Sequence, residues 1–158
     1  GYVKSRSCTA GAIEWWGAGG WSHATNLVAP GWVIDARAKG GVDRRPVSYL
    51  KDEQVEWLRV PCSPEAVRRT IEALESQVGK PYNFAAIAAF ASRRLAALLN
   101  RDWRSDVSWF CSDLQGWAGE QGGAWPVLRT ASVTLTPGDM RLVASARGAI
   151  KLNMPLFE

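Results

Sequence analysis

The chain has 158 residues, the length of one typical domain, and its 47% hydrophobic and 22% charged residues exclude a disordered or fibrous protein. A formal net charge of +4 is too small to indicate a nucleic-acid partner. No apolar run approaches the roughly 18 residues of a membrane span, so membrane association is not indicated. We expect a single globular domain over residues 1–158.

The cysteines form no metal-binding pattern. Cys8, Cys62 and Cys111 include no CxxC pair, and His23 is the only histidine. A structural zinc site needs about four Cys or His ligands in close spacing, so the sequence predicts no metal. The spacing leaves open whether Cys8 and Cys62 pair. Residues 1–6 contain no apolar signal-peptide segment, which makes the cytoplasm the default expectation for location.

The first third of the chain has the pattern of short strands. Gly11–Gly17 is short and aromatic, and Ser22–Ala29 and Gly31–Ala38 flank a Pro30-Gly31 breaker, which predicts a hairpin. Gln54–Val60 alternates polar and apolar residues, as a half-buried strand does, and ends at a proline.

The middle of the chain is predicted to be helical. Ser63-Pro64-Glu65 is a helix start signal, and apolar residues then recur at helical spacing until Gly79. A second helix is expected over Phe84–Leu99, and a third from Cys111 to about Gln121, closed by Gly122-Gly123.

The last part of the chain is predicted to hold a short turn at Thr136–Asp139 and a final apolar segment through Leu152. Strands followed by helices, without regular alternation, indicate an α+β fold in which an antiparallel sheet or barrel packs against about three helices. The sequence does not indicate an oligomeric state.

Cys111 is the first candidate for chemistry. A cysteine in the first turn of a helix lies beside unpaired backbone N–H groups and the positive end of the helix dipole, and both favour the thiolate. The alternative is that Cys111 is a small buried apolar residue behind two aromatic ones. If the protein is a Cys–His hydrolase, His23 must be its base, because the chain has no other histidine.

Asp35 is the third candidate, since an acid in an apolar strand needs a partner. A two-residue Pro30-Gly31 turn would place Asp35 on the sheet face away from His23. A three-residue loop, Val28–Pro30, would place the two side chains opposite each other, about 5 Å apart at Cβ. We favour the second register, because Pro at the first central position suits turns that splay hairpin strands. The alternative is an ion pair of Asp35 with Arg37.

Five short segments, in this order, carry a resemblance to the circularly permuted branch of the NlpC-like, papain-fold cysteine hydrolases, the YiiX-like amidases. They are Trp21–His23, Val33–Ala36, Gly79–Phe84, Phe110–Leu114 and Thr136–Met140. The likeness spans residues 11–140. Asn83 stands where the family usually has an acid, and the third catalytic member here is Asp rather than the more frequent Glu.

The resemblance implies a permuted papain-like fold and a cysteine amidase or peptidase. In that mechanism Cys111 is the nucleophile, His23 the base and Asp35 the residue that orients the base. Tyr82 and the Cys111 backbone N–H would form the oxyanion hole, and Trp21 and Ser22 are the expected substrate-binding residues. No cofactor is needed.

The expected substrate is a peptide or another acyl amide, of the peptidoglycan stem-peptide type that the family is best known for. Hydrolysis or transfer of a lipid ester or thioester by the same residues is the second choice. A non-enzymatic alternative is a carbohydrate-binding module, in which several of the nine tryptophans line one face, with Cys111 and His23 far apart. The residues proposed for that face are Trp15, Trp16, Trp21 and Trp32.

Overall fold

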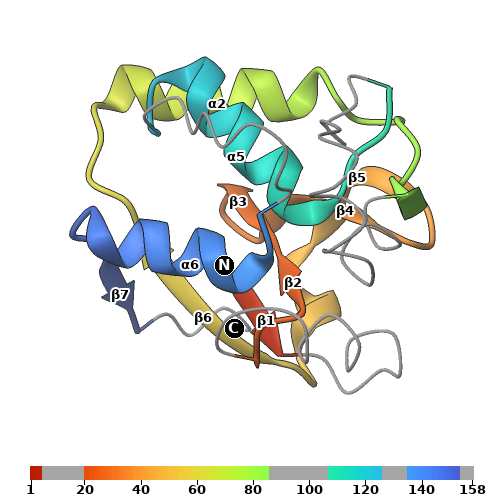
Figure 1. The fold of residues 1–158 in the computed structure, drawn as a ribbon, viewed down its shortest axis with the longest axis horizontal. Coiled ribbons are helices and arrows are strands. Elements are labelled where there is room, and N and C mark those ends of the chain that lie inside the picture. Colours follow the sequence, from red (N-terminus) through yellow and green to blue (C-terminus); the bar gives the residue numbers. More distant parts are fainter. Residues whose placement is uncertain (5–19, 86–106, 126–134, 154–158) are drawn as a thin grey trace, which may run out of the picture.

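The computed structural model of the protein describes residues 1–4, 20–85, 107–125 and 135–153. These residues form an α+β fold with two antiparallel sheets and three α-helices, as the coarse fold class predicted (Figure 1). The strand predicted at Gly11–Gly17 and most of the helix predicted at Phe84–Leu99 lie outside the described residues.

The first sheet has four strands in the order β2-β1-β6-β7. Their bounds are Tyr2–Lys4 for β1, His23–Ala24 for β2, Gln54–Arg59 for β6 and Ile150–Leu152 for β7. The prediction of a strand at Gln54–Val60 is confirmed, whereas β1 was not predicted. Val3 in β1 faces His23 in β2, so β1 fixes the position of the histidine.

The second sheet has three strands in the order β3-β4-β5, and a short 3₁₀ helix, η2, follows it. The bounds are Asn26–Ala29 for β3, Trp32–Arg37 for β4, Gly41–Pro46 for β5 and Val47–Leu50 for η2. The chain passes from the first sheet to the second at Thr25, which divides the single strand predicted at Ser22–Ala29 in two. Neither β5 nor η2 was predicted.

The β3–β4 hairpin corrects the predicted loop. The connection is the two-residue Pro30-Gly31 turn, in which Gly31 has a φ of 74°, and the three-residue loop Val28–Pro30 is wrong. The register shifts by one residue between the pairs Leu27–Val33 and Ala29–Trp32. This extra residue is a β-bulge, and it reverses the facing of β4 relative to β3 that the two-residue turn alone would give, so that the Asp35 side chain meets His23 in the neighbouring β2.

Helix α2, Pro64–Glu75, begins where predicted. The Ser63 side chain at its N-cap accepts a hydrogen bond from the backbone N–H of Ala66, and Pro64 occupies the first turn. The helix ends three residues before the predicted boundary, and turns lead on to Gly79.

Helix α5, Cys111–Gly122, confirms the predicted third helix and its start at the cysteine. Gly123 follows it with a φ of 76°, the left-handed conformation that a glycine adopts at low cost after a helix. Figure 1 shows α5 beside α2, and α5 also packs against β2 and β4. Helix α5 therefore contacts one strand of each sheet.

Two glycines allow α5 to approach its neighbours closely. A Cβ atom on Gly119 would lie 1.4 Å from Cδ1 of Trp125, and one on Gly122 would lie 2.0 Å from Oγ1 of Thr70 in α2. Any side chain at these positions would overlap atoms of the neighbouring residues. The absence of a Cβ at Gly122 thus sets the spacing of the two helices.

Helix α6, Pro137–Ala146, was not predicted. Thr136–Asp139 was predicted to be a turn, but it starts a helix. The Thr136 hydroxyl accepts from the backbone N–H of Asp139, and the Asp139 carboxylate accepts from the backbone N–H of Thr136. This reciprocal capping box, with Pro137 in the first turn, satisfies the N–H groups that would otherwise be unpaired.

Candidate active site

Cys111 is the first residue of α5 and is buried, with 1% of its surface exposed. The helix begins with the hydrogen bond from Leu114 N to the Phe110 carbonyl, 3.0 Å. Phe110 at the N-cap provides no side-chain acceptor for the first-turn N–H groups. These N–H groups and the positive end of the helix dipole therefore favour negative charge at the first turn of the helix, including on any oxygen placed beside it.

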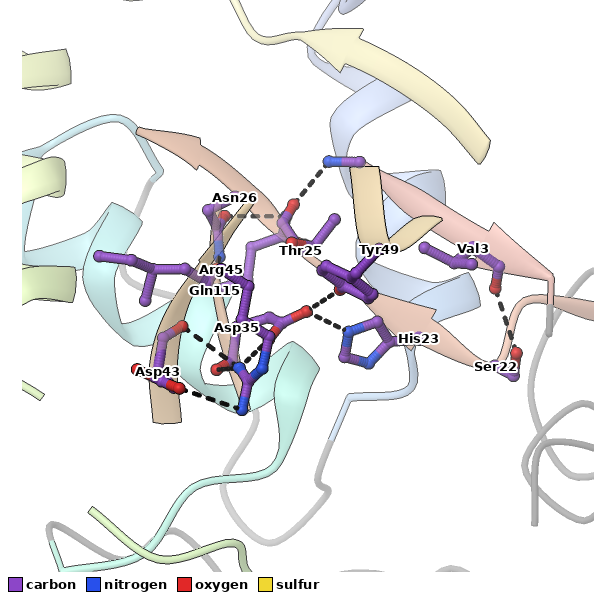
Figure 2. A network of polar contacts seen from close by, with 12 residues as sticks. Val3, Ser22, His23, Thr25, Asn26, Asp35, Asp43, Arg45, Tyr49 and Gln115 are labelled. Atoms are coloured by element: carbon purple, nitrogen blue, oxygen red, sulfur yellow. Dashed lines mark hydrogen bonds and ion pairs between the residues drawn. The ribbon is translucent and has the colours of Figure 1, made fainter. Parts of the chain in front are cut away.

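His23 and Asp35 are in direct contact, as predicted. Nε2 of His23 lies 2.7 Å from Oδ2 of Asp35, and the Asp35 side chain is fully buried. Figure 2 shows the imidazole ring directed at this carboxylate. Since Nε2 is engaged, Nδ1 is the ring nitrogen that remains for another partner.

Cys111 is that partner. Burial disfavours the imidazolium, but the Asp35 carboxylate and the Cys111 thiolate, through charge and hydrogen bonding, outweigh it and raise the pKa of His23 to about 9. The structure therefore brings the three predicted residues together in the order cysteine, histidine, aspartate. The histidine stands between the other two.

Asp35 has two further partners that were not predicted. Its Oδ1 accepts from Nη1 of Arg45 at 2.6 Å, and its Oδ2 accepts from the Tyr49 hydroxyl. Figure 2 shows Arg45 and Tyr49 approaching the carboxylate from β5 and from η2. Arg37, the alternative ion-pair partner, has its guanidinium 4.7 Å from the centre of the Tyr49 ring instead.

These contacts determine the charge of Asp35. Burial favours the neutral acid, but His23, the Tyr49 hydroxyl and the Arg45 guanidinium hold the pKa of Asp35 below its ordinary value. Burial, together with the Asp35 charge, raises the pKa of Tyr49, so its phenol keeps its proton and donates it to Asp35. Asp35 is thus an ionised carboxylate, and both of its oxygens accept hydrogen bonds.

Tyr82 lies next to the start of α5. Trp109 N donates to the Pro81 carbonyl at 3.0 Å, and Asn83 N donates to the Trp109 carbonyl at 2.9 Å. The Tyr82 ring packs against that of Phe110, with 5.9 Å between centroids. Burial and then the nearby Cys111 charge raise the pKa of Tyr82, so its phenol remains a hydrogen-bond donor.

Trp21 and Ser22, the predicted substrate-binding residues, are both buried. The Ser22 hydroxyl donates to the Val3 carbonyl at 3.1 Å, and the Trp21 ring packs edge-on against Tyr2. Both side chains therefore hold β1 and β2 together, and neither presents an open surface.

Two of the four tryptophans proposed for the alternative carbohydrate-binding face, Trp21 and Trp32, lie in the described residues, and they do not form a common face. Trp21 is in the core, whereas Trp32 is 43% exposed and lies under the guanidinium of Arg44. Trp15 and Trp16 lie outside the described residues.

Neither a metal site nor a membrane helix is found in the described part of the chain. No three or more His, Cys, Asp or Glu side chains come together there in a way that could hold a metal ion. None of the helices described is both long enough and apolar enough to cross a bilayer. Cys62 and Cys111 are free thiols, and Cys8 lies outside the described ranges.

No family model, no curated protein and no solved structure matches this chain. The function must therefore be argued from the contacts of Cys111, His23 and Asp35.

Proposed function

We propose that the protein is a cysteine hydrolase of the permuted NlpC-like, papain-fold type, and that it cleaves an amide bond. The observation that supports this most directly is the buried His23–Asp35 contact of 2.7 Å, with Cys111 as the second partner of the histidine. A nucleophile, a base and an orienting acid at hydrogen-bonding distance are the arrangement that acyl transfer requires.

The first half of the reaction forms an acyl-enzyme. His23 takes the thiol proton, and the Cys111 thiolate attacks the substrate carbonyl carbon, so that an S–C bond forms and the carbonyl oxygen takes up the negative charge. The backbone N–H of Cys111 and the Tyr82 hydroxyl stabilise this oxyanion. The C–N bond then breaks, and His23 gives its proton to the leaving amine.

The second half releases the acyl group. His23, now neutral, accepts a proton from a water molecule as the water oxygen attacks the thioester carbon. The C–S bond breaks, the carboxylic acid leaves, and the Cys111 sulfur recovers its proton from His23. Asp35 keeps its negative charge throughout and balances the imidazolium that appears in each step.

The chemistry does not by itself distinguish an amide from an ester or a thioester, since all three form the same acyl-enzyme. An amide is our first choice because the protonated His23 can supply the proton that a poor amine leaving group needs. A lipid ester or thioester remains the second choice.

The proposal is tested by trapping the acyl-enzyme. Wild-type protein is incubated with panels of peptide amides, short acyl esters and acyl thioesters, quenched in acid, and its intact mass and peptide map are recorded. We expect an acyl adduct on Cys111, none in Cys111→Ala, and an unchanged adduct in Cys62→Ala. Adducts that form equally on Cys62, or none from any panel, would count against the hydrolase.

A further inference from the structure

A cavity of about 480 Å³ lies between α2 and strand β6. None of Cys111, His23 and Asp35 lines it. Its volume falls in the range of small-molecule sites, about 300–1,000 Å³. The apolar part of its wall includes Leu58, Val67, Ile71, Leu74, Trp125 and Leu152.

Helix α2 contributes a continuous apolar strip to this cavity. Val67, Ile71 and Leu74 are spaced so that they share one side of the helix, and all three line the cavity. Leu74 is buried, but Val67 remains 44% exposed although it lines the cavity. The apolar side of α2 is therefore only partly covered by the described residues, as expected at a site for an apolar ligand.

Two groups on β6 give the cavity a polar end. The indole Nε1–H of Trp57 is buried, with the residue 6% exposed, and has no acceptor in the described part of the protein. Arg59 lies two residues further along the strand and also lines the cavity. It carries the only charged side chain among the described residues that line the cavity, and no ion pair joins it to them.

The unpaired indole N–H of Trp57 and the positively charged Arg59 together favour a ligand group that accepts a hydrogen bond and carries negative charge. A carboxylate meets both needs, because one oxygen can accept from the indole N–H and the other can face the guanidinium. An alkyl chain would meet the remaining requirement, because the wall along α2 offers no charge.

We infer that this cavity binds an amphiphilic carboxylate, with its head group at Trp57 and Arg59 and its alkyl chain along Val67, Ile71 and Leu74. The site stands apart from the proposed hydrolase chemistry. A Cys111→Ala protein, which lacks the nucleophile, should bind the carboxylate as well as the wild type does.

Cys62 provides the readout, because it is exposed and lies on the cavity wall. Cys111→Ala protein is titrated with sodium decanoate below its micelle concentration, and the alkylation rate of Cys62 by iodoacetamide is followed by peptide mass spectrometry. We expect saturable protection of Cys62 by decanoate and none by acetate. Absence of saturable protection would overturn the inference.

Two matched variants locate the alkyl chain. Val67→Glu places a charge on the cavity wall and should abolish the protection. Val78→Glu makes the same change at a valine of similar exposure, 40%, that does not line the cavity, and should leave it intact. Thermal unfolding shows whether each variant is folded. Equal protection in both folded variants, or equal loss, would contradict the site.

Arg59→Gln locates the head group. Loss of one exposed charge pair should weaken decanoate binding by about three- to fivefold and leave binding of neutral decanol unchanged. If Arg59→Gln weakens the binding of decanoate and decanol alike, or of neither, the assigned head-group position is wrong. Amide hydrolysis by the wild type is measured separately, so a failure of the proposed hydrolase leaves this binding result intact.

Discussion

His23 and Asp35 stand in different sheets, and yet 2.7 Å separates Nε2 of one from Oδ2 of the other. The histidine is placed by its pairing with β1, and the aspartate by the centre of the β3-β4-β5 sheet. The two sheets are joined at Thr25, between β2 and β3. The contact therefore depends on the junction between the sheets as well as on the hairpin.

The three residues should differ in how much activity their loss removes. We expect Cys111→Ala and His23→Ala to abolish hydrolysis, because no other described group replaces a nucleophile or a base. Asp35→Asn should retain a residual rate, lower by about 10⁴-fold, because an orienting acid assists the base without replacing it. Steady-state kinetics on folded variants measure this. Full activity in His23→Ala would contradict the mechanism.

His23 should titrate well above an ordinary histidine. Because it is the only histidine in the chain, its imidazole C–H resonances in NMR are unambiguous. We expect a midpoint near pH 9 in the wild type. The midpoint should fall in Asp35→Asn, where the imidazolium loses its strongest favourable partner. A wild-type midpoint near 6.5 would show that the charged partners do not act on this ring.

The same shift predicts how stability depends on pH. The folded pKa of His23 lies above the ordinary value of 6.5, so the imidazolium stabilises the fold fully below pH 6.5, and this contribution is lost as pH rises toward 9. Its size is at most on the order of 3 kcal/mol. Urea unfolding at pH 6, 7.5 and 9 should show a steeper loss in the wild type than in His23→Gln. Parallel curves would contradict this.

Tyr49 should affect the rate through Asp35. Tyr49→Phe removes a hydrogen bond to a buried carboxylate, a change that costs about 1.5–3 kcal/mol. We expect a lower kcat, a nearly unchanged KM, and an acid limb of the pH–rate profile moved to higher pH, because the Asp35 carboxylate is less stabilised. Reduced thermal stability with an unmoved acid limb would indicate a purely structural role.

Gly122 should be intolerant of a methyl group. In Gly122→Ala the new Cβ would lie 2.6 Å from the backbone N of Thr70 and 2.8 Å from the Ala66 carbonyl oxygen, so α2 and α5 must separate. We expect a loss of about 1–3 kcal/mol in the free energy of unfolding.

Gly116→Ala is the matched control in the same helix. Its Cβ would meet only Met140, at an ordinary distance of 3.7 Å, so the higher helix propensity of alanine should leave stability unchanged or raise it. Similar destabilisation by both substitutions in chemical unfolding would show that the close contact at Gly122 is not the cause.

The sequence predicts best where local signals fix the structure. The start of α2 at a capping serine and the end of α5 at Gly123 depend on neighbouring residues alone, and both were predicted. Thr136–Asp139 was misjudged because Thr, Pro, Gly and Asp favour a turn and a helix start equally well, and only the continuation decides.

Arg45 and Tyr49 escaped prediction for a different reason. Arg45 lies in β5, a strand without clear polar–apolar alternation, and Tyr49 lies in η2 directly after it. Their role appears only once β5 is aligned with β4, where Asp35 faces Asp43. Long-range pairing of this kind is not encoded in local spacing. The His23–Asp35 contact was predicted from a three-residue loop that does not exist, and the extra residue comes from the β-bulge instead.

Because of that bulge, the direction of the Asp35 side chain depends on whether the β3–β4 connection changes in length by an odd or an even number of residues. Deleting one residue from the hairpin arm would preserve both strands and their backbone hydrogen bonds, but would exchange the two faces of β4, turning Asp35 away from His23. A deletion of two residues would restore the facing. Related chains that keep the histidine–acid contact should therefore vary in this hairpin by even numbers of residues, and loop grafts made here should follow the same rule.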